Sequence, residues 1–298
     1  MSACVSPGRR SKEQWVFGQT EPVPDLETLA WGYGLLEGPR VDDADNLYFS
    51  DVHNGGVYRR APDGTIDVAV PKRRGVGGIA LHADGGIVVS GRNLCHVRNG
   101  KSRIVFAPDA PGLNDLFIDA AGRIICGTMR SDPFDLDAPR TPGECYLVDA
   151  EDHASELYDD VALTNGIGFS PDGSVLYHAD TVRGVWAHDY DDGSVSGRRL
   201  LLTLDLVTPD GLAVDESGTV WVADVGGSSA VRGFGPDGKE RGRIPVPAMM
   251  VTSVCFGGVD RRDVYIVTGD NTEDPDKGGS IFRTRADVAG VAASKARV

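Results

Sequence analysis

Residues 163–180 read "LTNGIGFSPDGSVLYHAD", two apolar runs separated by a Pro-Asp-Gly turn. Alternating apolar runs joined by such a turn predict a β-hairpin. The hairpin accounts for nearly every residue of the stretch except Asn165, a polar residue that precedes a glycine at the start of the first strand. Asn165 therefore needs an explanation beyond local structure.

The same pattern recurs along the chain, for example as "LEGPRVDDADNLYFSDV" at 36–52 and "PDGLAVDESGTVWVADV" at 209–225. When all copies are aligned on Asn165, one column of six residues results: Glu37, Gly77, Asn114, Asn165, Asp210 and Thr252. Each copy has two strands, a tight turn and a more polar strand-like stretch. Steps of about forty residues with this content are typical of the four-stranded blades of a β-propeller.

The repeats predict an all-β fold, a six-bladed β-propeller formed by residues 1–298 as a single domain, with inner strands starting near residues 37, 77, 114, 165, 210 and 252. The chain before Glu37, including "QWVFGQTEPVP" at 14–24, is expected to supply the outer strand of the last blade, because a closed ring leaves no exposed edge. Residues 1–14 are expected to be a flexible N-terminus. A two-sheet sandwich is the alternative, but it would not require six in-register copies.

Charge and hydropathy narrow the class of partner. The formal net charge is −14, and the largest basic run is "KRR" at 72–74. This balance argues against nucleic acid and favours a cation as a partner. The chain has no apolar run of about eighteen residues and no apolar segment of a secretory signal at its start. We therefore expect no membrane association and a cytoplasmic location; the sequence does not determine the oligomeric state.

Cysteine and histidine spacing gives no support for a soft-metal site. The five cysteines are widely spaced without a C-x-x-C pair, and Cys126 and Cys255 lie in apolar runs where a small core residue is expected. The six histidines form no H-E-x-x-H pattern. His53, in the loop "DVHNGG", is the one histidine considered further, although solvation is its simpler interpretation.

Propeller geometry explains Asn165. The first strand of each blade lines the central channel, so the aligned column forms a ring at one mouth of that channel. Two carboxylates facing each other there, Glu37 and Asp210, repel unless a cation neutralises them. Their oxygen ligands favour Ca²⁺, Mg²⁺ or Mn²⁺, while Zn²⁺ and Fe²⁺ also accept carboxylates. A polar, water-filled channel is the alternative, but three of these residues are each followed by glycine in different blades.

Four stretches carry a resemblance to a known family: "LLEGPRVDDADNLYFSD", "LNDLFIDAAGRIICGTM", "TNGIGFSPDGSVLYHADT" and "TPDGLAVDESGTVWVAD". In order and spacing they resemble the motifs of the regucalcin (senescence marker protein), gluconolactonase and luciferin-regenerating-enzyme family over nearly the whole chain. The resemblance implies a propeller with one divalent cation in the channel mouth and, in many members, hydrolysis of sugar lactones. It implies Glu37, Asn165 and Asp210 as metal ligands, Asp210 also as general base, and Asn114 as a substrate contact or a further part of the metal shell.

One departure from the family pattern concerns substrate binding. Aldonolactonases of the family commonly have Arg-x-Asn-Asp-Gly where this chain has "GLNDL", so Gly112 replaces the arginine and Leu116 replaces the later glycine. An arginine that would contact the lactone is thus missing from its usual place. We expect a lactone other than gluconolactone as substrate.

Long loops are expected to border the same mouth. If inner strands begin at the metal, the loops that follow each second strand return to it. The longest are "MRSDPFDLDAPRTPGE" at 129–144 and "TGDNTEDPDKGG" at 268–279. Long loops in compact domains are often functional. Arg130 and Phe134 are therefore candidates for substrate contact.

The sequence thus predicts a divalent-metal-dependent lactonase, in which the cation polarises the lactone carbonyl and Asp210 helps to deprotonate the attacking water. The substrate is a small lactone or ester. Two alternatives remain open at this point. One is a phosphotriesterase-like or other ester hydrolase that uses the same metal site; the other is a non-catalytic metal-binding propeller that docks a protein partner.

Overall fold

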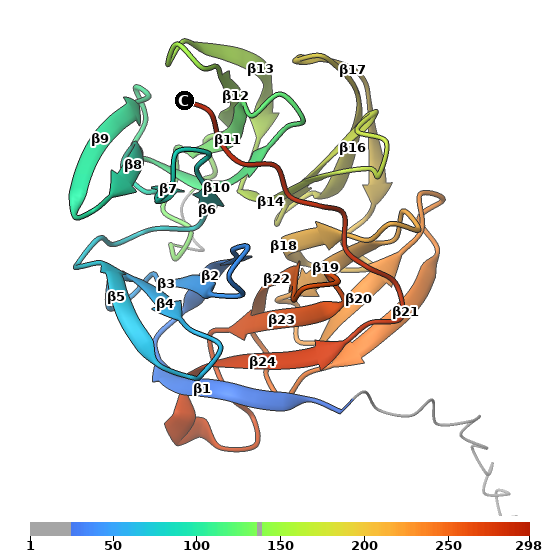
Figure 1. The fold of residues 1–298 in the computed structure, drawn as a ribbon. Coiled ribbons are helices and arrows are strands. Elements are labelled where there is room, and N and C mark those ends of the chain that lie inside the picture. Colours follow the sequence, from blue (N-terminus) through green and yellow to red (C-terminus); the bar gives the residue numbers. More distant parts are fainter. Residues whose placement is uncertain (1–24, 136–138) are drawn as a thin grey trace, which may run out of the picture.

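The computed structural model describes residues 25–135 and 139–298. Six four-stranded antiparallel sheets are arranged as blades around a central axis, which confirms the predicted all-β six-bladed propeller (Figure 1). Each blade except the last takes its four strands consecutively from the chain, with the first strand innermost. The residues of the aligned column lie within two residues of the starts of these inner strands.

The strand bounds follow in blade order. The first blade contains β2 (Leu36–Val41), β3 (Leu47–Asp51), β4 (Val57–Arg60) and β5 (Ile66–Val70). The second contains β6 (Ile79–Leu81), β7 (Ile87–Val89), β8 (Leu94–Arg98) and β9 (Lys101–Phe106). The third contains β10 (Gly112–Ile118), β11 (Ile124–Met129), β12 (Gly143–Val148) and β13 (Ala154–Val161).

The second half of the ring continues the same order. The fourth blade contains β14 (Thr164–Phe169), β15 (Val175–Asp180), β16 (Gly184–Asp191) and β17 (Ser194–Leu202). The fifth contains β18 (Pro209–Val214), β19 (Val220–Asp224), β20 (Ala230–Phe234) and β21 (Glu240–Pro245). The last contains β22 (Val251–Gly257), β23 (Asp263–Thr268), β24 (Gly279–Arg285) and β1 (Glu27–Tyr33), with a short 3-10 helix η1 (Pro275–Lys277) before β24.

The N-terminal strand closes the ring. β1 pairs antiparallel with β24, so the first and last parts of the described chain complete one blade (Figure 1). This is the outer strand expected from the chain before Glu37. It is formed by residues 27–33, whereas the predicted segment 14–24 and the predicted flexible residues 1–14 lie outside the described part of the chain. Within that described part, no helix is long and apolar enough to cross a membrane.

Glycines after the column residues allow neighbouring inner strands to approach closely. A β-carbon on Gly166 would lie 2.3 Å from the backbone nitrogen of Leu212, and one on Gly211 would lie 2.0 Å from Oγ of Ser253. The inner strands also show register irregularities at this level, for example between Thr164 and Ile167. The sequence motif therefore has a packing cause that is separate from any chemistry of the column residue.

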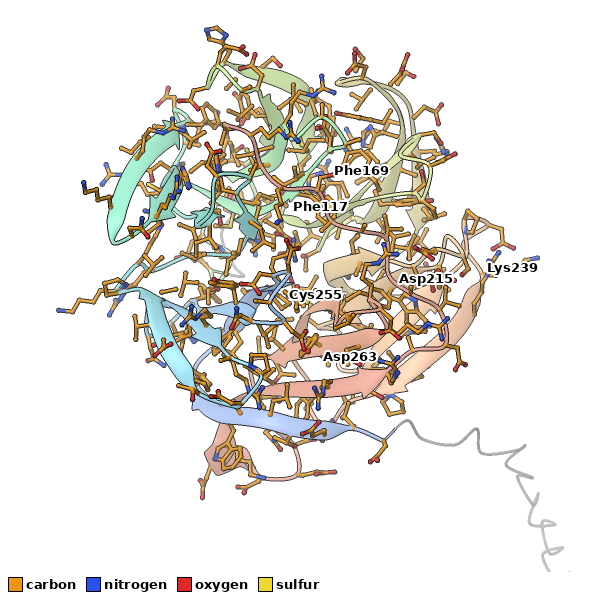
Figure 2. All side chains as sticks on the ribbon, viewed as in Figure 1. Phe117, Phe169, Asp215, Lys239, Cys255 and Asp263 are labelled. Carbon is orange, nitrogen blue, oxygen red and sulfur yellow. The ribbon has the colours of Figure 1, made fainter. Side chains whose placement is uncertain are left out.

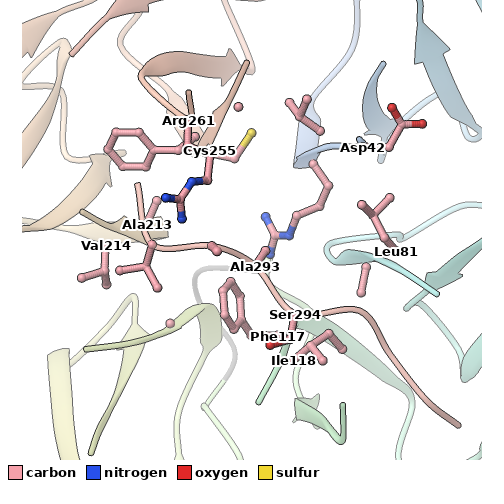
Figure 3. Close-up of a pocket in the computed structure, with 18 of the residues that line it drawn as sticks. Asp42, Leu81, Phe117, Ile118, Ala213, Val214, Cys255, Arg261, Ala293 and Ser294 are labelled. Carbon is pink, nitrogen blue, oxygen red and sulfur yellow. The ribbon is translucent and has the colours of Figure 1, made fainter. Parts of the chain in front are cut away.

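The two mouths of the channel differ. Inner strands begin at one face, here called the metal mouth because the predicted ligands lie there. At the opposite mouth the segment 291–296 crosses the ring, with backbone hydrogen bonds to Val214 and Leu81 (Figure 1). Beneath it lies a cavity of about 420 Å³ lined by the far ends of the inner strands (Figure 3). Phe117, Phe169 and Cys255 lie near the centre of the ring at this level (Figure 2).

Apolar side chains fill the spaces between blades. Phe49, Phe234 and Phe282 are fully buried, and separate clusters join neighbouring sheets. Cys126 and Cys255 are buried core residues, as predicted. Burial of this kind aligns the inner strands rigidly, so the residues at their starts hold fixed positions around the channel.

Candidate metal centre and active site

Glu37, Asn165 and Asp210 occupy equivalent places near the starts of β2, β14 and β18. All three side chains are nearly buried, with 8 %, 7 % and 7 % of their surface exposed. They come from the first, fourth and fifth blades and face the channel from different sides. The repeat alignment therefore placed these three residues at one level of the ring.

The carboxyl groups of Glu37 and Asp210 lack a sufficient counter-charge. Burial raises the pKa of Asp210 well above its usual value, and the negative charge of Asp115 raises it further. Burial also raises the pKa of Glu37, followed by the charges of Asp210 and Asp115, while the backbone of Gly38 and the charge of Arg40 act in the opposite direction. Both shifts act towards protonation, and a nearby cation would act in the opposite direction.

The oxygen atoms present fit a divalent cation. Oδ1 of Asp210 is buried and has no hydrogen-bond partner among the residues that the structure describes. A buried carboxylate oxygen without a partner is costly, and cation binding would compensate it. Residues 25–135 and 139–298 contain no group of three His, Cys, Asp or Glu side chains placed to hold a metal. A site at this mouth therefore depends on the amide oxygen of Asn165 as well as on the two acids.

Two hydrogen bonds fix the orientation of Asn165. Its side-chain amide donates to Oγ1 of Thr181 at 2.8 Å, and its Oδ1 accepts from Nδ2 of Asn114 at 2.7 Å. Asn114 also donates to the backbone carbonyl of Thr164 at 2.8 Å. The oxygen of Asn165 is thereby held on the side of Asn114 and keeps a second lone pair for a ligand.

Gly77, the second blade's member of the column, provides space for Asn114. A β-carbon at Gly77 would lie 1.7 Å from Oδ1 of Asn114. No side chain could occupy that position without displacing Asn114. The glycine in the column is thus a partner of the neighbouring blade, whereas the sequence alignment left it without a role.

Asp115 is a third buried acid that the sequence analysis missed. It is 5 % exposed and accepts a hydrogen bond from the backbone nitrogen of Leu116 at 2.7 Å. Nη2 of Arg40 lies 3.7 Å from Oδ1 of Asp115, and Arg40 also donates to the carbonyl of Leu116. A signal was available, because Asp115 stands at the position where the motifs of Gly38, Gly166 and Gly211 have glycine.

A buried hydrogen-bond chain supports the strand that carries Asn165. Oγ1 of Thr164 lies 2.7 Å from Nε2 of His178, and Nδ1 of His178 lies 2.8 Å from the hydroxyl of Tyr158. Burial, with smaller effects of His188 and Arg198, lowers the pKa of His178 to about 3. The neutral imidazole donates from one nitrogen and accepts at the other, which satisfies both neighbours.

The described residues that follow β11 include two of the predicted substrate contacts, Arg130 and Phe134. The ring of Phe134 lies 5.2 Å from that of His53, which belongs to the first blade. Arg130 instead pairs with Glu144 at 2.8 Å and donates to the carbonyl of Asp109 at 3.2 Å. The predicted candidate Phe134 therefore contacts His53, and the guanidinium of Arg130 is bound to Glu144 and to the segment before β10.

Comparison with known proteins agrees with this architecture. The model of the SMP-30/gluconolactonase/LRE-like region matches residues 35–270, which include the inner strands of all six blades. The chain belongs to this family. The resemblance inferred from the sequence motifs is thereby confirmed.

Two curated relatives of this family member are named as lactonases. A pentonolactonase from Haloferax volcanii is 32% identical over 257 residues, covering 82% of this chain and 84% of the relative. A 6-deoxy-6-sulfogluconolactonase from Pseudomonas putida is 32% identical over 266 residues, covering 83% and 89%. These similarities support lactone hydrolysis as the class of reaction.

Solved structures show the same fold. A luciferin-regenerating enzyme superposes with a TM-score of 0.83 at 25% identity, over 92% of this chain and 100% of the other. A calcium-binding protein, regucalcin, from Agrobacterium tumefaciens superposes with a TM-score of 0.79 at 23% identity, over 91% and 97%. The second likeness concerns the fold alone.

Proposed function

We propose that this protein is a divalent-metal-dependent lactonase that opens a cyclic ester other than gluconolactone. The observation that carries the proposal is the buried, unpartnered Oδ1 of Asp210 beside Glu37 in the channel mouth. Relatives named as lactonases support the reaction class. The absence of an arginine at Gly112 supports a different lactone.

Glu37, Asn165 and Asp210 would hold the ion. Their oxygens suit Ca²⁺, Mg²⁺ or Mn²⁺ and are also acceptable to Zn²⁺ or Fe²⁺. A bound cation would supply Lewis-acid chemistry, polarising the lactone carbonyl and lowering the pKa of water. Three protein ligands would leave room for substrate, as catalytic sites require.

Asp210 is the proposed general base. Its carboxylate takes a proton from water as the water oxygen forms a bond to the lactone carbonyl carbon. The ring carbon–oxygen bond then breaks, and the alkoxide that leaves takes up the proton held by Asp210, giving a hydroxy acid and restoring the carboxylate. A basic Asp210 has to be ionised, so the bound cation and the general base depend on each other electrostatically.

Asn114 is the proposed substrate contact. Its amide nitrogen has two hydrogens, and these are donated to Asn165 and to the carbonyl of Thr164. Only Oδ1 is left, so Asn114 would accept a hydrogen bond from a substrate hydroxyl and would not donate one. Arg130 is a weaker candidate than the sequence implied, because reaching a substrate would require it to leave Glu144.

The test is activity of metal-stripped protein reconstituted with single divalent ions. Substrates should include sugar lactones, non-sugar lactones, linear esters and phosphotriesters. The proposal expects lactone opening that returns with an added ion and disappears with chelator. Preference for a phosphotriester, or equal activity with and without metal, would contradict it.

A further inference from the structure

Two loops of the second blade concentrate positive charge at the metal mouth. The loop 71–78 carries Lys72, Arg73 and Arg74, and the loop 90–93 carries Arg92, with no acidic residue in either. The whole chain has a net charge of −14. The basic character of these loops is therefore local, and it lies beside the proposed reaction site.

Arg73 binds the two loops together. Its Nε donates to the carbonyl of Ser90 at 2.9 Å, and its Nη2 donates to the carbonyl of Asn93 at 2.6 Å. A β-carbon on Gly91 would lie 3.2 Å from the carbonyl oxygen of Arg74. The backbones that carry Arg74 and Arg92 are therefore held next to each other.

Arg74 and Arg92 are exposed, and neither guanidinium makes a hydrogen bond or ion pair with the described residues. Other arginines at the surface do find acids: the half-buried Arg59 pairs with Asp67 and the exposed Arg199 pairs with Asp189, each at 2.7 Å. Two unpaired arginines on neighbouring backbone segments can bind an external anion, because a guanidinium offers paired donors to planar or tetrahedral oxyanions.

Backbone contacts connect these arginines to the ring. Gly91 exchanges hydrogen bonds with Leu113, at 2.7 and 3.3 Å, and Leu113 precedes Asn114. On the other loop, Gly77 lies three residues after Arg74 and faces the side chain of Asn114. Both basic loops therefore border the residue that we assign to substrate.

The rings of His53 and Phe134 are in contact at the same mouth. His53 belongs to the first blade and Phe134 to the third, so their ring contact joins the loops that flank the second blade. The backbone nitrogen of Phe134 donates to Asp132, which orders its part of the loop. Arg74 also touches the first-blade loop, since its Cγ lies 3.0 Å from the position of a β-carbon on Gly55.

We infer that Arg74 and Arg92 bind an anionic substituent of the substrate: a lactone bearing a carboxylate, sulfonate or phosphate group. This inference rests on the proposed lactonase function and names its substrate class. It is consistent with the glycine at position 112. The arginines of the second-blade loops would bind the substrate in place of the arginine that is missing from the third blade.

Kinetics with Arg74→Gln, Arg92→Gln and the double variant test the inference. The measured quantity is the ratio of kcat/KM for an anionic lactone to kcat/KM for a neutral lactone of similar size. Loss of one charge-assisted contact should lower this ratio at least about tenfold, mainly through KM. The matched control is Arg98→Gln, an exposed arginine at the opposite end of the same blade, which should leave the ratio unchanged.

Carboxylate, sulfonate and phosphate lactones compared in parallel identify the anion. Direct binding of sulfate to the metal-loaded protein, measured by calorimetry, gives a readout independent of turnover and should weaken at least about tenfold in the double variant. If the protein opens no lactone but binds sulfate through these arginines, the lactonase proposal fails and the anion site is supported. If neutral lactones are opened as fast as anionic ones and the double variant changes neither ratio nor sulfate binding, the inference is overturned while the lactonase proposal stands.

Discussion

The side-chain amide of Asn114 donates a hydrogen bond of 2.7 Å to Oδ1 of Asn165, which joins the third blade of the ring to the fourth. The proposed substrate contact therefore also orients a proposed metal ligand. Residues that hydrogen-bond to a metal ligand commonly contribute about 10- to 100-fold to metal affinity. We expect Asn114→Ala to weaken metal binding by roughly this factor, measured by titration of the stripped protein with a divalent ion.

Gly77→Ala should also weaken metal binding. Its β-carbon would lie 1.7 Å from Oδ1 of Asn114 and would displace that side chain. In an Asn114→Ala background, Gly77→Ala should lower metal affinity little further, since the side-chain amide that it would displace is already absent. Gly112→Ala is the control: its β-carbon would have ordinary contacts of 3.4 Å or more. Additive losses of metal affinity in the double variant would show that the two residues act independently.

Gly112→Arg tests the missing arginine. A β-carbon at this position would lie 3.4 Å from the carbonyl oxygen of Gly91 and 4.0 Å from Cε of Met129, both ordinary contacts, so the substitution creates no clash at the backbone. We expect the variant to gain kcat/KM on gluconolactone relative to the parent, with Gly112→Gln as the size-matched uncharged control. No gain over the glutamine variant would mean that the family's arginine does not determine substrate choice in this chain.

The sequence was most informative where the repeats could be aligned, because the alignment identified equivalent residues of equivalent strands. Six aligned copies predicted the propeller and placed Glu37, Asn165 and Asp210 at one level of the channel, because equivalent residues of equivalent strands share a height. The pairing between Asn114 and Asn165 was not predictable, since the twist between blades and the rotamers decide it. Asp115 was visible as a departure from glycine, yet its approach to Arg40 needs three dimensions.

Loops were predicted less well than strands. The sequence correctly expected the segments after the second strands to return to the metal mouth, but contacts across that mouth have no periodic signal. Arg130 was predicted to contact substrate, which stays a prediction, and its ion pair with Glu144 was not foreseen. His53 and Phe134 were considered separately, while the fold brings their rings into contact.

Buried histidines should make the protein acid-sensitive. Burial lowers the pKa of His178 to about 3 and that of His188 to about 4, below the value near 6.5 of an unfolded chain. The unfolded state thus binds more protons between these values, so stability is complete above about pH 6.5 and falls as the pH decreases. Between the folded and unfolded pKa values, each histidine lowers the free energy of unfolding by about 1.4 kcal/mol for each pH unit of decrease.

The measurement is the free energy of unfolding of the parent and of His178→Gln at several pH values between 7 and 5 (roughly the range in which unfolded histidine titrates). The variant should be less stable at neutral pH, because it disturbs the contacts with Thr164 and Tyr158. The difference should shrink as the pH falls. A difference independent of pH would show that His178 does not stay neutral in the folded protein.

Removal of the metal should lower stability as well as activity, because Glu37 and Asp210 are both buried and the charge of Asp210 helps to raise the pKa of Glu37. An ion that binds only the folded state at a few hundred to a thousand times its dissociation constant adds roughly 3 to 4 kcal/mol. Thermal unfolding with and without chelator measures this shift, and elemental analysis measures occupancy. An unchanged unfolding temperature together with no bound metal would exclude the site.

Asp210 has two proposed roles, and substitution separates them. Asp210→Asn keeps an oxygen of similar shape but removes charge and basicity, so metal binding should weaken yet stay measurable, while turnover at saturating metal falls by about 10²- to 10⁴-fold. Asn165→Ala removes a neutral ligand, and excess metal should restore more of its activity. Occupancy has to be measured directly in both variants, because loss of metal would otherwise imitate loss of the base. If fully loaded Asp210→Asn turns over within about threefold of the parent, less than any positioned base contributes, Asp210 is not the general base and the proposed mechanism is wrong.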